Sequence, residues 1–327
     1  MNLHKLAAAS LLALAPSLAP SIKAESINPP TTPQTSPAMN AQEKKNLDLV
    51  MNWWREVVSG GHMELTAKYQ AEDYIQHNPN LPTGRAAFIN FLQNVMKVQP
   101  KNPIPATLTP GPVVAGAKGD FVFLVFETES KDPRDASKTF HSNSFEVLRI
   151  ANGKVQEHWD SAQRTALPPG APKPAPFPQM PNTFSKGSAG SLSADEKKNL
   201  ALATEELKDM LQYGHLELAD KTMDPGYLQH NPNVPQGRDG FKKFMAARPG
   251  RTPEPLKPEW KDAPSITLVS GPYVVFAWDR KAKDPSDPSQ EYVWNHFDIV
   301  RIEKGLIKEH WDEARINPPA PANQKKQ

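Results

Sequence analysis

The stretch Tyr74–Phe91, YIQHNPNLPTGRAAFINF, is repeated at Tyr227–Phe244 as YLQHNPNVPQGRDGFKKF, with eleven identities in eighteen aligned positions. The offset between the copies is 153 residues. A second pair of blocks, FEVLRIANGKVQEHWD at Phe145–Asp160 and FDIVRIEKGLIKEHWD at Phe297–Asp312, is repeated with an offset of 152 residues. Two separate blocks that recur in the same order at nearly the same interval indicate a duplicated domain.

The duplication divides the 327-residue chain into two domains joined by proline-rich sequence. Residues 40–165 are predicted to form repeat one and residues 192–317 repeat two. Residues 166–191, with PPGAPKPAPFPQMP at their centre, are predicted to be a partly extended linker. Residues 25–39 have too little apolar content to fold, so we expect a disordered tether there, and a disordered tail at 318–327.

The first 24 residues have the features of a secretory signal peptide. A short positive segment, Met1–Lys5, precedes the Ala/Leu-rich run Leu6–Leu18, and Ala24 is a suitable last residue before cleavage. An uncleaved anchor is the alternative, although Pro16 and Pro20 would break such a helix. We therefore expect a periplasmic or secreted protein with no membrane attachment after cleavage.

Charge and cysteine content narrow the classes of function. Lys and Arg number 38 against 36 Asp and Glu, which leaves a net charge of +2 and no basic patch for nucleic acid. The chain has no cysteine, which excludes disulfides and a thiol nucleophile. An exported protein without cysteine fits a bacterial periplasm or a secreted enzyme better than a disulfide-rich module.

Within each repeat, helical patterns come first and strand patterns follow. KKNLDLVMNWWREVV and KKNLALATEELKDML open the repeats, and the apolar runs Phe121–Phe126 and Tyr273–Trp278 are typical of central strands. This order predicts an α+β fold of two tandem cone-shaped domains, each a curved antiparallel sheet wrapped around its N-terminal helices. The interior of such a cone can hold a small apolar ligand.

Histidine and asparagine recur in the QHNPN loops. His77 and His230 are candidates for proton exchange near neutral pH, because imidazole is the side chain whose ordinary pKa suits it. The adjacent Asn78 and Asn231 could bind a substrate carbonyl. The alternative is that these side chains only satisfy backbone groups in a loop made rigid by proline.

A carboxylate recurs on one strand of each repeat. Alternation along FDIVRI places Asp298 on the same face as Val300 and Ile302, and Glu146 occupies the matching position in repeat one. Burial beside apolar side chains would raise the pKa of a carboxyl toward that of a useful base. Asp298 and Glu146 are therefore the candidate acid–base groups, the alternative being a strand-end residue that pairs with an arginine or faces solvent.

The EHWD blocks end each repeat. Alternation separates Trp159 and Trp311 from His158 and His310. The tryptophans are candidates for an apolar pocket wall or for ordinary core residues, and the histidines are predicted to face a polar sheet surface or an interface. No metal-ligand spacing, glycine-rich phosphate loop or GxSxG motif is present, so we expect neither metal nor cofactor.

QHNP, then PxGRxxFxxF, an apolar strand and finally FDIVRIxxGxIxEHWD together resemble the SnoaL-like polyketide cyclase family, which belongs to the NTF2-like superfamily of α+β cones. The resemblance covers nearly all of both repeats. It implies an interior pocket, dimerisation through the outer sheet face, and ring closure by aldol condensation without metal or organic cofactor. It also implies that a strand aspartate, here Asp298 or Glu146, works with a nearby histidine, here His230 or His77.

We therefore predict an exported protein with a small-molecule pocket in each repeat and metal-free acid–base chemistry next to a carbonyl. Asp298 is the expected base and His230 its partner, and repeat two is the stronger candidate because it holds the aspartate. The expected ligand is a small apolar or carbonyl-containing molecule. Two alternatives remain open: a non-catalytic binding protein, and a structural module that forms an intrachain pseudo-dimer or a homodimer.

Overall fold

The computed structural model describes residues 25–167, 187–248 and 252–317; the predicted signal peptide, tail and most of the linker lie outside these residues. The helices and helical turns are α1 (Ala41–Trp53), η2 (Trp54–Val58), η3 (Met63–Leu65), α2 (Thr66–Tyr69), α3 (Arg85–Asn90), η4 (Phe91–Val95), α4 (Ala194–Thr204), η5 (Glu205–Met210), η6 (Leu216–Leu218), α5 (Ala219–Thr222) and α6 (Arg238–Ala246). The strands are β1 (Glu25–Ser26), β2 (Gln34–Thr35), β3 (Gln70–Gln76), β4 (Val114–Lys118), β5 (Phe121–Asp132), β6 (Asp135–Ala151), β7 (Lys154–Asp160), β8 (Met223–Gln229), β9 (Ile266–Ser270), β10 (Tyr273–Asp284), β11 (Asp287–Glu303) and β12 (Leu306–Asp312).

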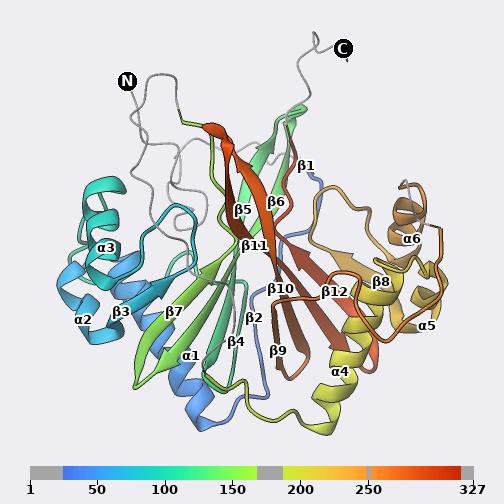
Figure 1. Ribbon diagram of the computed structural model, residues 1–327, viewed down its shortest axis with the longest axis horizontal. Helices are drawn as coiled ribbons and strands as arrows, with labels where there is room; N and C mark the ends of the chain where they lie inside the picture. The colour runs from blue at the N-terminus through green and yellow to red at the C-terminus, as the bar shows by residue number, and fades with distance from the viewer. Residues whose placement is uncertain (1–24, 168–186, 249–251, 318–327) are drawn as a thin grey trace.

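Each repeat folds its strands into one curved sheet that its own helices cover on one face (Figure 1). The strand order is β2-β4-β5-β6-β7-β3 in the first sheet, with β1 beside β6, and β8-β12-β11-β10-β9 in the second. The predicted α+β class is confirmed. The sheets are mixed rather than purely antiparallel, because β3 runs parallel to β7 and β8 runs parallel to β12.

The first helix of each repeat begins at the same kind of cap. Asn40 accepts a hydrogen bond from the backbone N–H of Glu43, whose carboxylate accepts one from the backbone of Asn40, and Ser193 and Glu196 repeat this arrangement. Behind these caps the helices pack on the inner face of the sheet, and two separate apolar cores result. The cores position the polar groups on the same inner faces.

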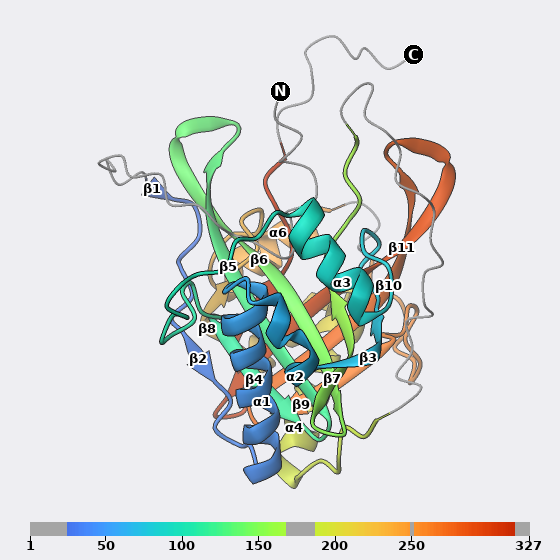
Figure 2. The same ribbon diagram turned by 90° about the vertical axis from the view of Figure 1, so that its left-hand side faces the viewer.

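The outer faces of the two sheets pack against each other in the middle of the molecule (Figures 1 and 2). A third apolar cluster joins them: Val114, Phe121, Phe123, Val125, Phe145, Val147 and Trp159 from the first sheet, and Ile266, Leu268, Tyr273, Val275, Ala277, Phe297, Ile299 and Trp311 from the second. Phe145 and Phe297 are equivalent residues of the two repeats, and their rings stack with centroids 5.7 Å apart at an interplanar angle of 3°. Contact between equivalent residues is typical of a two-fold interface.

Residues 25–39 lie between the repeats, which differs from the disordered tether expected there. Thr31 is buried, and its hydroxyl donates to Glu127 at 2.9 Å and accepts from Trp311 Nε1 at 3.0 Å. The same hydroxyl lies 3.1 Å from Nδ1 of His230. The segment has little apolar content. Hydrogen bonds to its buried polar groups, rather than burial of apolar side chains, therefore hold it in place.

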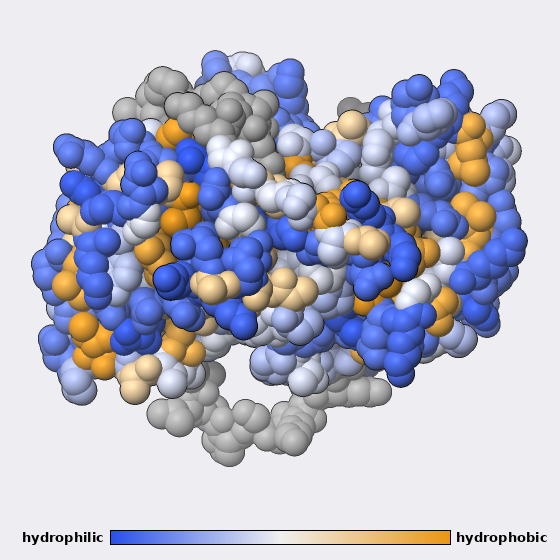
Figure 3. Space-filling view, turned by 90° about the horizontal axis from the view of Figure 1, so that it is seen from below, coloured by the Kyte–Doolittle hydropathy of each residue, from blue (hydrophilic) through white to orange (hydrophobic). Residues whose placement is uncertain are grey.

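The surface seen from below in Figure 3 is mostly hydrophilic, with hydrophobic residues in small separate groups. The large apolar surface of the sheets is instead buried between the repeats. Among the described residues, no helix combines the length and apolar character that crossing a bilayer requires.

Candidate functional site

The inner face of the second sheet carries a carboxylate held between two histidines. Asp298 on β11 has one oxygen 2.8 Å from Nε2 of His310 and the other 3.2 Å from Nε2 of His296. His296 and Asp298 are two positions apart on one strand, so alternation directs both side chains to the same face. His310 comes from the adjacent strand β12, where it is paired with Val300.

A second group of side chains fixes the orientation of His310. Its Nδ1 lies 3.1 Å from Oε1 of Glu206, which η5 carries across from the helical layer. The hydroxyl of Tyr227 donates to the same oxygen at 3.1 Å, and the amide of Gln229 donates to that hydroxyl at 3.1 Å. Both nitrogens of His310 therefore face a carboxylate, an arrangement that favours the doubly protonated ring.

The charges of this cluster stabilise one another. Burial opposes ionisation of Asp298, but the charges and hydrogen bonds of His296 and His310 outweigh it and hold the pKa of this carboxyl below its usual range. Burial also opposes a charge on His310, yet Glu206 and Asp298 raise its pKa well above the ordinary value. The pKa of His296 is raised in the same way by Asp298 and Glu313, despite burial.

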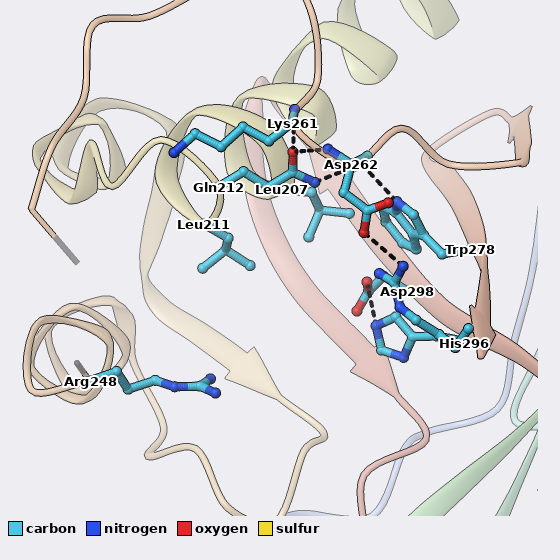
Figure 4. Close-up of a pocket in the computed structure, with 10 residues that line it drawn as sticks. Leu207, Leu211, Gln212, Arg248, Lys261, Asp262, Trp278, His296 and Asp298 are labelled. Carbon is cyan, nitrogen blue, oxygen red and sulfur yellow. Dashed lines mark hydrogen bonds and ion pairs between the residues drawn. The ribbon is translucent and has the colours of Figure 1, made fainter. Parts of the chain in front are cut away.

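A pocket of about 500 Å³ opens onto this cluster. It is lined by Leu207, Leu211, Gln212, Arg248, Lys261, Asp262, Trp278, Arg280, His296 and Asp298. Figure 4 shows His296 and Asp298 side by side on one wall, bonded to each other, with Arg248 on the opposite side. The volume lies within the usual range for small-molecule sites, and the wall contributes both a carboxylate and an imidazolium to the pocket.

The equivalent cluster in repeat one is buried and differently charged. His158 Nε2 lies 2.6 Å from Oε2 of Glu146, and both side chains are fully buried. Burial, with the charge of His77, lowers the pKa of His158 to about 3. Burial, with the charge of Asp160, raises the pKa of Glu146 well above its ordinary value. Burial therefore favours the neutral forms of both Glu146 and His158.

Tryptophan side chains occupy the space beside the cluster in repeat one. Trp53 and Trp54 both have ring centroids 6.2 Å from that of His158. In the aligned sequence of repeat two the same positions hold Glu206 and Leu207. An indole on this side of the histidine fills space that repeat two leaves to its pocket.

Comparison with known protein families finds a match to part of repeat two. Residues 204–310 match the family model of the SnoaL-like domain. Over these residues, repeat two is similar to the SnoaL-like domain. The match runs from the last residue of α4 into β12 and includes Glu206, His296, Asp298 and His310.

Solved structures that resemble the chain each correspond to roughly one repeat. TsrD from Streptomyces laurentii is 20% identical with a TM-score of 0.26, covering 38% of this chain and 90% of that one. An NTF2-like protein from Mesorhizobium loti is 15% identical with a TM-score of 0.26, covering 38% and 97%. IdmH from Streptomyces antibioticus is 16% identical with a TM-score of 0.25, covering 35% and 89%. No curated protein matches the chain.

The structure places the predicted partner of Asp298 elsewhere in the SnoaL-like domain. His230 stacks on Trp311 with ring centroids 4.6 Å apart, and its Nε2 lies 3.1 Å from Glu309. Trp311 belongs to the cluster between the sheets, so His230 lies on the outer face and Asp298 on the inner one. The pairing of His230 with Asp298 is therefore corrected to His296 and His310.

Repeat one shows the same separation. His77 stacks on Trp159 with centroids 4.7 Å apart and lies 2.9 Å from Glu157, on the face away from Glu146. Trp159 and Trp311 belong to the core between the sheets, and neither lines the described pocket. The EHWD histidines, predicted to face a polar surface or an interface, instead lie on the inner faces.

The asparagines of the QHNPN loops hold the aspartates that end the repeats. Asn231 donates to Asp312 at 2.8 Å, and Asn78 donates to Asp160 at 2.8 Å. Burial raises the pKa of both aspartates to about 6. Neither asparagine is among the residues that line the described pocket, so in this structure they position a carboxylate.

Two groups of side chains have donor atoms close enough to be considered as metal ligands. They are Glu146, His158 and Asp160 in repeat one, and Asp298, His310 and Asp312 in repeat two, each within 4.8 Å. The donors of the second group are already engaged: His310 bonds Asp298, and Asp312 accepts from Asn231 and from the backbone of Ala314. This arrangement fits a hydrogen-bonded acid–base network, and we assign no metal to it.

Proposed function

We propose that the SnoaL-like domain of repeat two binds a small carbonyl compound and exchanges a proton at the carbon next to the carbonyl. The observation that carries the proposal is the His296–Asp298 pair on the wall of the pocket. Asp298 would accept the proton as the C–H bond breaks, and the electrons of that bond would move to the carbonyl oxygen. The positive charge of His296, whose ring nitrogens face Asp298 and Glu313, would stabilise the oxyanion electrostatically.

Such an enolate supports two outcomes. Return of the proton to another carbon gives an isomerase, and attack of the enolate carbon on a second carbonyl gives an aldol-type cyclase. Neither outcome needs a metal or an organic cofactor. The network of Glu206, His310 and Asp298 holds the carboxylate of Asp298 in its ionised form, as a base requires.

The test is the substitution Asp298→Asn in the full chain, assayed by deuterium exchange at the α-carbon of candidate ketones. We expect the exchange rate to fall by about 10²–10⁴-fold, the usual contribution of a general base. His230→Asn is the matched control, because this histidine lies on the other face of the sheet and should leave exchange unchanged. Exchange that survives in Asp298→Asn and disappears in His230→Asn would contradict the assignment.

Binding without turnover is the second candidate function. The observation that favours it is that both oxygens of Asp298 already face an imidazole, which lowers the pKa of the carboxyl and weakens it as a base. In that case the wild type would bind a ketone, leave it undeuterated in D₂O, and retain its affinity in Asp298→Asn.

We further propose that repeat one is the structural half of an intrachain pseudo-dimer in an exported protein. The stacking of Phe145 on Phe297 and the tryptophans beside His158 support the structural role. The signal-like sequence of residues 1–24 supports export. The pseudo-dimer predicts that the full chain sediments as a monomer. Export predicts that N-terminal sequencing of the mature protein finds the first 24 residues removed.

A further inference from the structure

Several side chains that line the pocket of repeat two differ from those at the aligned positions of repeat one. Arg248, Arg280 and His296 all line it. At the aligned positions, repeat one has Val95, Thr128 and Ser144. At these three positions repeat two carries nitrogen-bearing side chains that repeat one lacks, in a chain whose formal net charge is only +2.

Two of the three lysine and arginine side chains around the pocket are neutralised by neighbouring acids. Lys261 lies 2.6 Å from Glu254, and Arg280 lies 2.7 Å from Asp262. Arg248 has no ion pair among the described residues. Figure 4 shows its guanidinium directed across the pocket toward the wall that carries His296 and Asp298.

Three apolar side chains line the pocket beside the polar Gln212 and Asp262. Leu207 and Trp278 are buried side chains that line the cavity, and Leu211 adds a third apolar contact. A ligand that fills about 500 Å³ would therefore meet an apolar wall, the acid–base pair and the guanidinium of Arg248.

We propose that the ligand of repeat two is an apolar carbonyl compound that carries a carboxylate, and that Arg248 binds this carboxylate. The inference rests on the proposed function, since it names the substrate class of the same pocket. A guanidinium offers two parallel N–H donors to a carboxylate, which would fix the orientation of the ligand as well as its affinity. The carbonyl end is thereby directed toward His296 and Asp298.

The test uses two probes with the same ring system, 2-naphthoate and 2-acetylnaphthalene, titrated calorimetrically into the full chain at pH 7. We expect Arg248→Gln to weaken 2-naphthoate binding by about fivefold or more and to leave 2-acetylnaphthalene unchanged. Lys243→Gln is the matched control, because this exposed lysine lies on α6, the helix that ends just before Arg248, and is not among the pocket-lining residues. Added salt should weaken only the naphthoate.

Imidazole chemical shifts of His296, followed by NMR, report whether a probe enters this pocket. If both probes shift His296 and Arg248→Gln leaves the naphthoate affinity unchanged, the carboxylate inference is wrong while the pocket stands. If neither probe shifts His296, the proposed function and the inference both fail.

Discussion

Trp53 and Glu206 occupy the same position in the two aligned repeats, and each lies against the equivalent histidine of its own repeat. The indole of Trp53 packs nearly perpendicular to the ring of His158, whereas Glu206 presents a carboxylate to His310. This exchange is one of the differences that set the electrostatic character of the two inner faces. The first favours neutral side chains, and the second favours ions.

The equivalent histidines should titrate at opposite ends of the pH scale. Burial lowers the pKa of His158 to about 3, so its ring should stay neutral at every pH above that value. His310 should remain charged well above pH 6.5, because Glu206 and Asp298 outweigh the effect of burial. Nitrogen-15 NMR of the two imidazole rings measures both pKa values. Glu206→Gln should lower the pKa of His310, and the exposed Glu217→Gln should not.

Stability should depend on pH through the Asp298–His310 pair. The lowered pKa of Asp298 contributes stability above about pH 3.9, which is lost as the pH falls through the folded-state pKa. The raised pKa of His310 contributes stability below about pH 6.5, which is lost as the pH rises through its folded-state pKa. Urea unfolding of His310→Gln should therefore show its largest deficit, about 3 kcal/mol, between those values. A deficit that is constant from pH 3 to pH 9 would contradict the assignment.

The contact between the sheets can be measured with a double-mutant cycle. Phe145→Ala and Phe297→Ala should each destabilise the chain by about 3–5 kcal/mol, because both rings are buried. The double variant should lose less than the sum, by about 0.5–1.5 kcal/mol for the stacked pair. Strict additivity in urea unfolding would mean that the two rings do not interact.

The segment before repeat one should contribute to stability through Thr31. Thr31→Val removes a hydroxyl that Glu127 and Trp311 both use, and it should cost about 1–3 kcal/mol. Thr32→Val makes the same chemical change at the exposed neighbouring residue, so its unfolding free energy should stay close to that of the wild type. Equal effects of the two substitutions would show that residues 25–39 are not held as the structure shows.

The sequence was sufficient to predict the α+β order and the inward position of Asp298, because both follow from periodicity. The position of His230 was predicted wrongly because β8 was not recognised. Tyr227 and Gln229 lie on the inner face, and alternation would have placed the next residue, His230, on the outer face. His310 was assigned to the wrong side because a register shift between Ile307 and Glu309 interrupts the alternation that was assumed along β12. His296, two residues before Asp298, satisfied the alternation rule and could have been found by it.

The packing of Trp53 and Trp54 against His158 has a consequence for how the molecule can tolerate the charged cluster of repeat two. In a homodimer every substitution enters both subunits, so charged side chains buried for catalysis destabilise both halves equally. Covalent fusion of the repeats removes that constraint. One half can be packed for stability with aromatic side chains while the other retains a hollow, highly charged interior that would be costly for a domain on its own.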